Sequence, residues 1–167
     1  MTALCDKPKL LPIADWPLSW RLDQWGSIIP AHHLAQMQTL GPEDANRIWK
    51  LILDAEIHAD FPFKRGLFPS IESLSLQPVS HQDDFRTVRR TVKKWLFQRG
   101  IPFGRRIYLS YQPDWAVMTT WKMLIRYWDL FYYSISDDLT VIDDTMTWAL
   151  LFFHEHEIHF GTRATNG

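Results

Sequence analysis

The order of two apolar patterns along the chain limits its fold more than any other feature. Between residues 31 and 128, apolar side chains recur mostly three and four positions apart, as on one face of a helix. Residues 129–162 instead consist of short β-branched and aromatic runs separated by turn-forming aspartates. Helices that precede strands, rather than alternate with them, favour an α+β domain. We therefore predict three or four helices packed on one face of a C-terminal antiparallel sheet.

Proline, glycine and capping residues mark the ends of the predicted helices. Pro42 suits the first turn of one helix, Ser80 and Asp114 can cap two others, and Gly100 supplies a stop. We predict helices over residues 31–39, 42–58, 81–99 and 114–128. Strands are predicted over residues 71–76, 106–111, 131–134, 139–142, 147–153 and 158–160.

The length of 167 residues and the globular composition predict one domain over residues 1–167. Its parts are an irregular segment over 1–30, a mainly helical region over 31–128 and an antiparallel meander over 129–162. Nine tryptophans supply a large apolar area, so most of them should be buried.

The sequence predicts a cytoplasmic protein. Cys5 is the only cysteine, which rules out an internal disulfide and fits a reducing compartment. The first residues show no secretory signal pattern, and nowhere do eighteen apolar residues follow one another, so we expect no association with a membrane.

The densest group of metal-ligand residue types is the run HEHEIH over residues 154–159. On a strand, His154 and His156 would share one face and could bind one divalent transition metal, with a third ligand from His58, His81 or an aspartate. The alternative, which we favour, is a polar hairpin edge without a cofactor. The helical zinc-protease pattern needs histidines four residues apart, and this run lacks it.

Charge is segregated along the chain despite a net charge of −1. Residues 86–106 carry eight lysines and arginines and no acid, whereas residues 127–162 carry only acids among their charged residues, if histidine is left aside. Like charges four apart on a helix repel by a few tenths of a kcal/mol, so an acidic group should offset them. The candidate partner-binding patch is Arg86, Arg89, Arg90, Lys93 and Lys94.

Two interpretations of this patch stay open: an internal acidic counterpart, or an external phosphate or acidic protein. Nucleic acid is disfavoured, because Phe85 and Trp95 belong to the apolar face of the predicted helix rather than to its basic face. The acidic pairs 137–138 and 143–144 could bind a cation or act in acid–base chemistry, but turn formation explains them better.

Part of the C-terminal region resembles small uncharacterised bacterial proteins. The resemblance rests on residues 133–141 (YSISDDLTV), Trp148, residues 152–156 (FFHEH), Phe160 and Gly161. These are families of unknown function, and some similar small α+β proteins serve as immunity proteins. The resemblance implies a bacterial protein and identifies no catalytic residue.

The motifs of common enzyme classes are missing from the sequence. It contains neither a phosphate-cradling glycine loop nor a Gly-x-Ser-x-Gly turn. We therefore favour a non-enzymatic protein, immunity-type or regulatory, that binds a protein partner or a second copy of itself. The alternative is a metal-dependent enzyme or a metal-binding protein that uses the histidines of the HEHEIH run.

Overall fold

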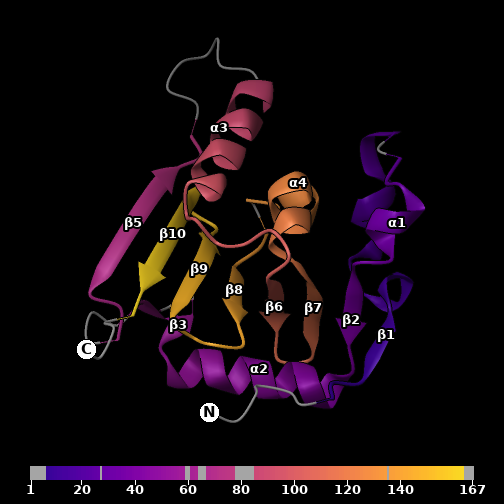
Figure 1. Ribbon diagram of the computed structural model, residues 1–167, viewed down its shortest axis with the longest axis horizontal. Helices are drawn as coiled ribbons and strands as arrows, with labels where there is room; N and C mark the ends of the chain where they lie inside the picture. Colours follow the sequence, from indigo (N-terminus) through magenta and orange to yellow (C-terminus); the bar gives the residue numbers. More distant parts are fainter. Residues whose placement is uncertain are drawn as a thin grey trace.

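The computed structural model describes residues 7–26, 28–58, 61–63, 67–77, 85–134 and 136–163. Helices and strands alternate irregularly over these ranges (Figure 1). The helices are η1 (Ile13–Asp15) and η2 (Ser19–Gly26), both of 3-10 type, and α1 (Ala31–Leu34), α2 (Pro42–Asp54), α3 (Phe85–Phe97) and α4 (Trp121–Phe131). The strands are β1 (Leu10–Pro12), β2 (Gln38–Leu40), β3 (Ile57–His58), β4 (Phe61–Pro62), β5 (Ser70–Ser75), β6 (Arg106–Gln112), β7 (Trp115–Thr120), β8 (Leu139–Asp143), β9 (Trp148–Phe153) and β10 (Glu157–Thr162).

One eight-stranded sheet organises the molecule, in the order β1-β2-β7-β6-β8-β9-β10-β5. All of its neighbouring strands are antiparallel. The α+β class is thus confirmed, but the predicted confinement of the sheet to the C-terminal region is wrong, because β1, β2 and β5 come from the first half of the chain. Strands β8, β9 and β10 form the predicted C-terminal meander.

Helices cover both faces of this sheet, which corrects the prediction of helices on one face. Strand β8 is buried along its whole length, so neither of its faces can be left to water. Leu109, Val141 and Leu150 face the core beneath α3 and α4. Tyr108 and Ile142, on the opposite face, pack with residues of α2.

The predicted helix over residues 114–128 is a strand followed by a shorter helix. Residues of β7 pair with β6 in a hairpin, and Asp114 lies in the turn between the two strands. The helix begins only at Trp121, where the Thr120 hydroxyl accepts a hydrogen bond from the Met123 amide. The predicted strand 131–134 is also wrong, since Phe131 ends α4 and no strand follows it directly.

The N-terminal segment is tied to the body of the molecule by a buried ion pair. The Arg21 guanidinium donates two hydrogen bonds to the Asp137 carboxylate, and both residues are buried. Arg21 also lies over the Tyr133 ring, 4.2 Å from its centroid. Trp16 is buried against Tyr111 and Phe131 in the main core.

Of the eight tryptophans whose side chains the structure describes, four are buried, three are partly buried and one is exposed, so fewer are fully buried than predicted. Trp16, Trp121, Trp128 and Trp148 belong to the core beneath α3 and α4, and Trp20 is exposed. No described helix is both long enough and apolar enough to cross a membrane.

We predict that the substitution Gly161→Ala destabilises the protein by about 1–3 kcal/mol, the usual range for an overpacked core. A methyl group at this position in β10 would lie 2.6 Å from Cε1 of Phe63 and 3.1 Å from Cβ of Phe68, and both phenylalanines are buried. Urea unfolding measures the change. Gly104→Ala is the matched control, because an added Cβ there meets no atom within 4 Å. Equal stability of the two variants would contradict this packing.

Candidate partner-binding surface

His154 and His156 do not lie on a strand. They belong to the turn between β9 and β10, and His156 has a positive φ of 62°. His154 donates its backbone amide to Asp138 and places Nδ1 2.9 Å from the same carboxylate. The shared strand face on which the predicted metal site depended is therefore absent.

The other proposed ligands are not gathered around this turn. The His58 ring packs against Trp49, with ring centroids 4.9 Å apart. His81 and Cys5 lie outside the described residues. Within the described ranges, no three His, Cys, Asp or Glu side chains are placed to hold a metal ion. Metal binding by His154 and His156 stays a prediction that this part of the structure does not favour.

The acidic pairs serve mainly structural roles, as expected for turn residues. Asp143 accepts hydrogen bonds from the Thr145 amide and hydroxyl, the Met146 amide and the Trp148 indole. Asp144 accepts two hydrogen bonds from Arg106, at 2.7 and 3.1 Å.

Helix α3 points its basic side chains outward because Val92 and Leu96 are buried on its other side. Arg89 has an internal counterpart: its Nε lies 3.0 Å from Oδ2 of Asp129 in α4. Arg86, Arg90 and Lys94 are exposed and make no ion pair within the described part of the chain. The internal interpretation of the basic patch therefore applies to Arg89, and the external one stays open for Arg86, Arg90 and Lys94.

Exposed phenylalanines lie next to these cations, a feature that the sequence did not reveal. Phe97 is 60% exposed and Phe103 50%, and their ring centroids are 5.8 Å apart. Phe97 shares the outward stripe of α3 with Arg90 and Lys94, seven and three residues before it. Phe85 is also exposed, at 62%, although its spacing matches the buried stripe, because it starts the helix at the end that extends beyond the sheet (Figure 1).

The loop between α3 and β6 is fixed in place by the start of α4. The Trp121 amide donates to the Arg105 carbonyl at 2.9 Å, and the Lys122 amide donates to the Phe103 carbonyl at 3.0 Å. First-turn amides of a helix have no partner inside the helix, so these carbonyls satisfy them. The loop is consequently held in a single position rather than left free.

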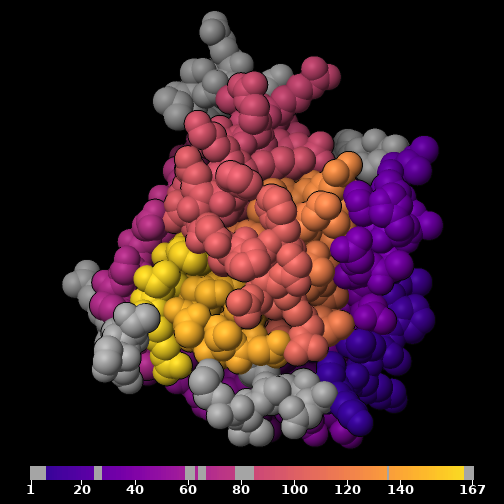
Figure 2. Space-filling model, in the orientation of Figure 1, coloured from indigo at the N-terminus to yellow at the C-terminus, as the bar shows by residue number. Residues whose placement is uncertain are grey.

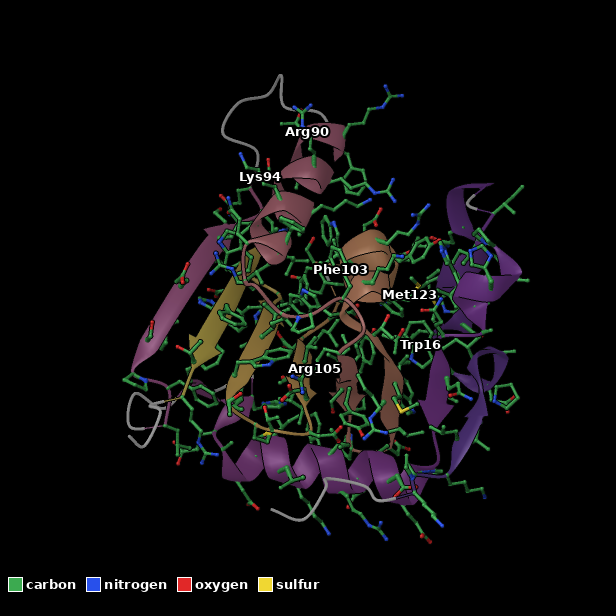
Figure 3. The ribbon with its side chains drawn as sticks, in the orientation of Figure 1. Trp16, Arg90, Lys94, Phe103, Arg105 and Met123 are labelled. Carbon is green, nitrogen blue, oxygen red and sulfur yellow. The ribbon has the colours of Figure 1, made fainter. Side chains whose placement is uncertain are left out.

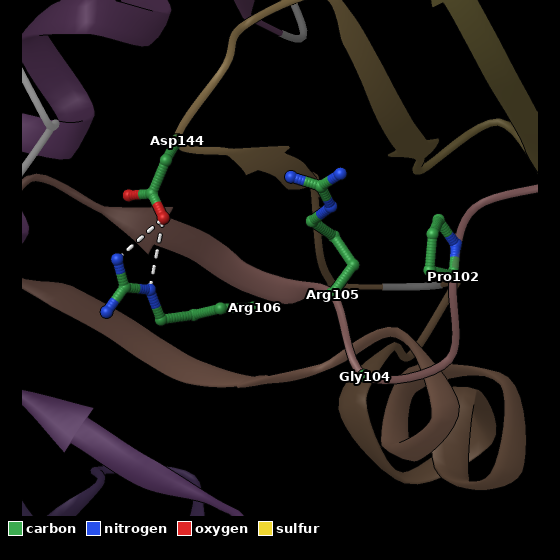
Figure 4. Close-up of a pocket in the computed structure, with 5 residues that line it drawn as sticks. All are labelled: Pro102, Gly104, Arg105, Arg106 and Asp144. Atoms are coloured by element: carbon green, nitrogen blue, oxygen red, sulfur yellow. Dashed lines mark hydrogen bonds and ion pairs between the residues drawn. The ribbon is translucent and has the colours of Figure 1, made fainter.

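An open depression of about 470 Å³ lies at this loop (Figure 4). It is lined by Pro102, Gly104, Arg105, Arg106 and Asp144. Arg106 is bound to Asp144, whereas Nε of Arg105 is 3.7 Å from Oδ2 of Asp143, which also accepts a hydrogen bond from the Trp148 indole. Arg105 is 41% exposed and is the cation of this depression most available to an external anion.

Arg90, Lys94, Phe97, Phe103 and Arg105 together form a surface that we call the cationic–aromatic strip. Figure 3 shows the labelled members in succession from α3 to the start of β6. In the space-filling view, α3 and the loop that follows it cover the centre of the face turned to the viewer (Figure 2). The strip combines three cations with two exposed aromatic rings and contains no acid.

Positive charge continues from α3 onto α4. Burial lowers the pKa of Lys93, and the nearby cations Arg89 and Arg126 lower it further, while Asp129 raises it. The Asp129 side chain is only 10% exposed; it contacts Arg89 and is the carboxylate that acts on Lys93. It offsets their repulsion where α3 packs on α4.

A model of the family described as "Protein of unknown function (DUF2947)" matches residues 10–161 of the chain. Neither a curated protein nor a solved structure matches this chain.

We predict that Asp129→Asn lowers the free energy of unfolding by about 1–2 kcal/mol at low salt, because it leaves Arg89 and Lys93 without their carboxylate. The loss should shrink when salt screens that repulsion, between about 0.02 and about 0.5 M NaCl. Urea unfolding at both salt concentrations tests this. Asp114→Asn, in an exposed turn, should change little. A salt-independent effect of Asp129→Asn would exclude the electrostatic explanation.

Proposed function

Because this chain belongs to the DUF2947 family, whose function is unknown, we propose a role from its own surface: it binds an acidic protein partner through the cationic–aromatic strip, without catalysing a reaction. The observation that carries the proposal is the exposed Phe97–Phe103 pair, which lies beside Arg90 and Lys94. These two cations make no ion pair within the described residues, and Arg105 makes only a long one, 3.7 Å to Asp143. We further propose that the protein is bacterial and cytoplasmic, and that it acts as an immunity-type or regulatory protein.

The strip has the chemistry of an interaction hot spot. Aromatic residues and arginine are enriched at protein interfaces, and burial of two half-exposed phenyl rings would contribute apolar area to a complex. Arginine also binds carboxylates with paired hydrogen bonds, while lysine contributes a point charge. A partner that presents carboxylates around an apolar patch would complement all five side chains.

The overall charge supports a protein rather than a nucleic acid as the partner. The chain has a net charge of −1 and a pI near 6.6, whereas nucleic-acid-binding domains are usually strongly basic. The two exposed phenylalanines pack on each other, which leaves less of each ring face for a stacked base. Nucleic-acid binding is therefore an alternative outcome of the test below.

The strip is built for binding rather than for chemistry. It contains arginine, lysine and phenylalanine, and no histidine, carboxylate or thiol that could form a catalytic pair. This composition supports a non-enzymatic role.

We predict that the double variant Lys94→Glu/Arg105→Glu loses the partner. Immobilised wild-type protein should retain an acidic protein from a bacterial lysate at low salt, and the double variant should not. With the purified partner, charge reversal should weaken binding about 100-fold or more, since like charges then face each other. Lys50→Glu, an exposed position on α2, is the matched control and should bind as the wild type does.

Several results would overturn this proposal. One is equal capture by the wild type and the double variant, and another is capture that nuclease treatment abolishes. Analytical ultracentrifugation tests whether a second copy of the chain binds to the strip. Self-association that the double variant retains would show that the strip is not the surface that binds the second copy. A strict monomer that captures nothing at low salt would leave the proposal without support and end it.

A further inference from the structure

A second group of basic side chains lies between α1 and α4 and shares no residue with the strip. Its centre is a buried polar pair: Nδ1 of His33 lies 2.6 Å from the Tyr127 hydroxyl. His33 is 8% exposed and Tyr127 is 7% exposed, so this hydrogen bond is largely shielded from water. The short contact fixes the two rings relative to each other.

Three further basic side chains surround this pair. The His32 ring centroid is 4.3 Å from that of His33, and the Arg126 guanidinium carbon is 5.8 Å from the centre of the Tyr127 ring. Lys122 is four residues before Arg126, on the same outward face of α4. His32, Lys122 and Arg126 are all exposed, so their basic groups are accessible to a ligand.

Within the described part of the chain, no carboxylate forms an ion pair with His33. Burial lowers the pKa of His33 most, and His32, Arg126 and Lys122 lower it further. All three charged neighbours that affect His33 are basic, and the Tyr127 hydroxyl completes its surroundings. Mutual repulsion of these groups is a cost that a bound anion would remove.

From this arrangement we propose that His32, His33, Lys122 and Arg126 bind a dianionic phosphoryl group, while the Tyr127 hydroxyl orients the His33 ring. Nδ1 of His33 is engaged by Tyr127, and its Nε2 makes no hydrogen bond within the described part of the chain. The Nε2–H tautomer can therefore donate to a ligand while the tyrosine hydroxyl holds Nδ1.

A phosphoryl dianion fits this group better than a carboxylate does. Four basic side chains from two elements can neutralise two negative charges and reach several oxygens at once. Arginine pairs with two phosphate oxygens in a fork, and charge-assisted hydrogen bonds of this kind are the stronger ones. A single carboxylate would leave part of the positive charge unpaired.

The lowered pKa of His33 predicts a pH dependence of stability in the absence of ligand. A histidine whose folded-state pKa lies below its ordinary value contributes full stability above about pH 6.5, and stability falls as pH drops toward the lowered value. The urea midpoint of the wild type should decrease over this range more steeply than that of His33→Asn, which retains an acceptor near Nδ1. Parallel slopes would show that His33 is not the titrating group.

The binding test is a titration of the full chain with sodium phosphate, phosphoserine or sodium sulfate at constant ionic strength, followed by NMR of the histidine side chains. We expect saturable shifts at His32 and His33 and none at His154 and His159. Arg126→Gln should weaken phosphate binding about tenfold, the equivalent of one lost charge-assisted pair. Arg47→Gln is the matched control, because Arg47 lies exposed on α2.

The arms of this titration separate the sources of the phosphoryl group. Equal affinity for inorganic phosphate and phosphoserine supports recognition of the phosphoryl group alone, and tighter binding of phosphoserine supports a phosphorylated organic ligand or peptide. Sulfate stays a dianion throughout the range, so its affinity should increase as pH falls and His33 takes up a proton. Shifts spread over all histidines, no saturation, or equal affinity in Arg126→Gln and the wild type would each overturn the proposal.

Discussion

The central strands of the sheet are apolar on both faces, and this constraint determines the rest of the molecule. Strand β8 is buried throughout, and β6 and β9 are buried at all but their ends, so helices must cover both sides. α2 covers one face and α3 with α4 the other, each through its apolar stripe. Once these stripes are buried, the polar residues of each helix can point only outward. The basic residues of α3 are exposed for this reason.

Packing of α3 against α4 also positions the surface features used in our proposals. Asp129 of α4 binds Arg89, and α4 holds the carbonyls of Phe103 and Arg105 through its first amides. A loop that would otherwise move is thereby fixed beside the end of α3, and the Phe97–Phe103 contact joins the two. Rigid placement of aromatic and cationic side chains lowers the entropic cost of binding.

Local patterns predicted most of the helices and strands but not their assembly. Gly100 follows the end of α3 with a φ of 70°, a conformation that glycine adopts without strain. Pro42 starts α2, where its missing amide hydrogen costs no hydrogen bond. By contrast, residues 115–120 match a helical spacing, yet they form β7. They do so because pairing with β6 outweighs the local preference, and spacing alone does not reveal this pairing. The face of the sheet that α2 covers is likewise decided by tertiary packing.

The candidate site was only partly predictable for the same reason. The run of lysines and arginines without an acid predicts the basic residues of α3, whereas Phe103 and Arg105 lie in a loop whose position depends on α4. The sequence leaves His154 and His156 between two predicted strands, and the metal site depends on their lying on a strand. The turn instead uses a positive φ at His156, which is uncommon for any residue other than glycine.

The most direct test of the central claim is lysine footprinting of the protein with its acidic partner bound. Acetylation, read by mass spectrometry, reports the exposure of Lys94 in the strip and of Lys50 on the opposite side of the sheet in the same experiment. Our account predicts that the complex protects Lys94 and leaves Lys50 as reactive as in the free protein. Protection of Lys50 alone, or unchanged reactivity at both lysines in a saturated complex, would contradict it.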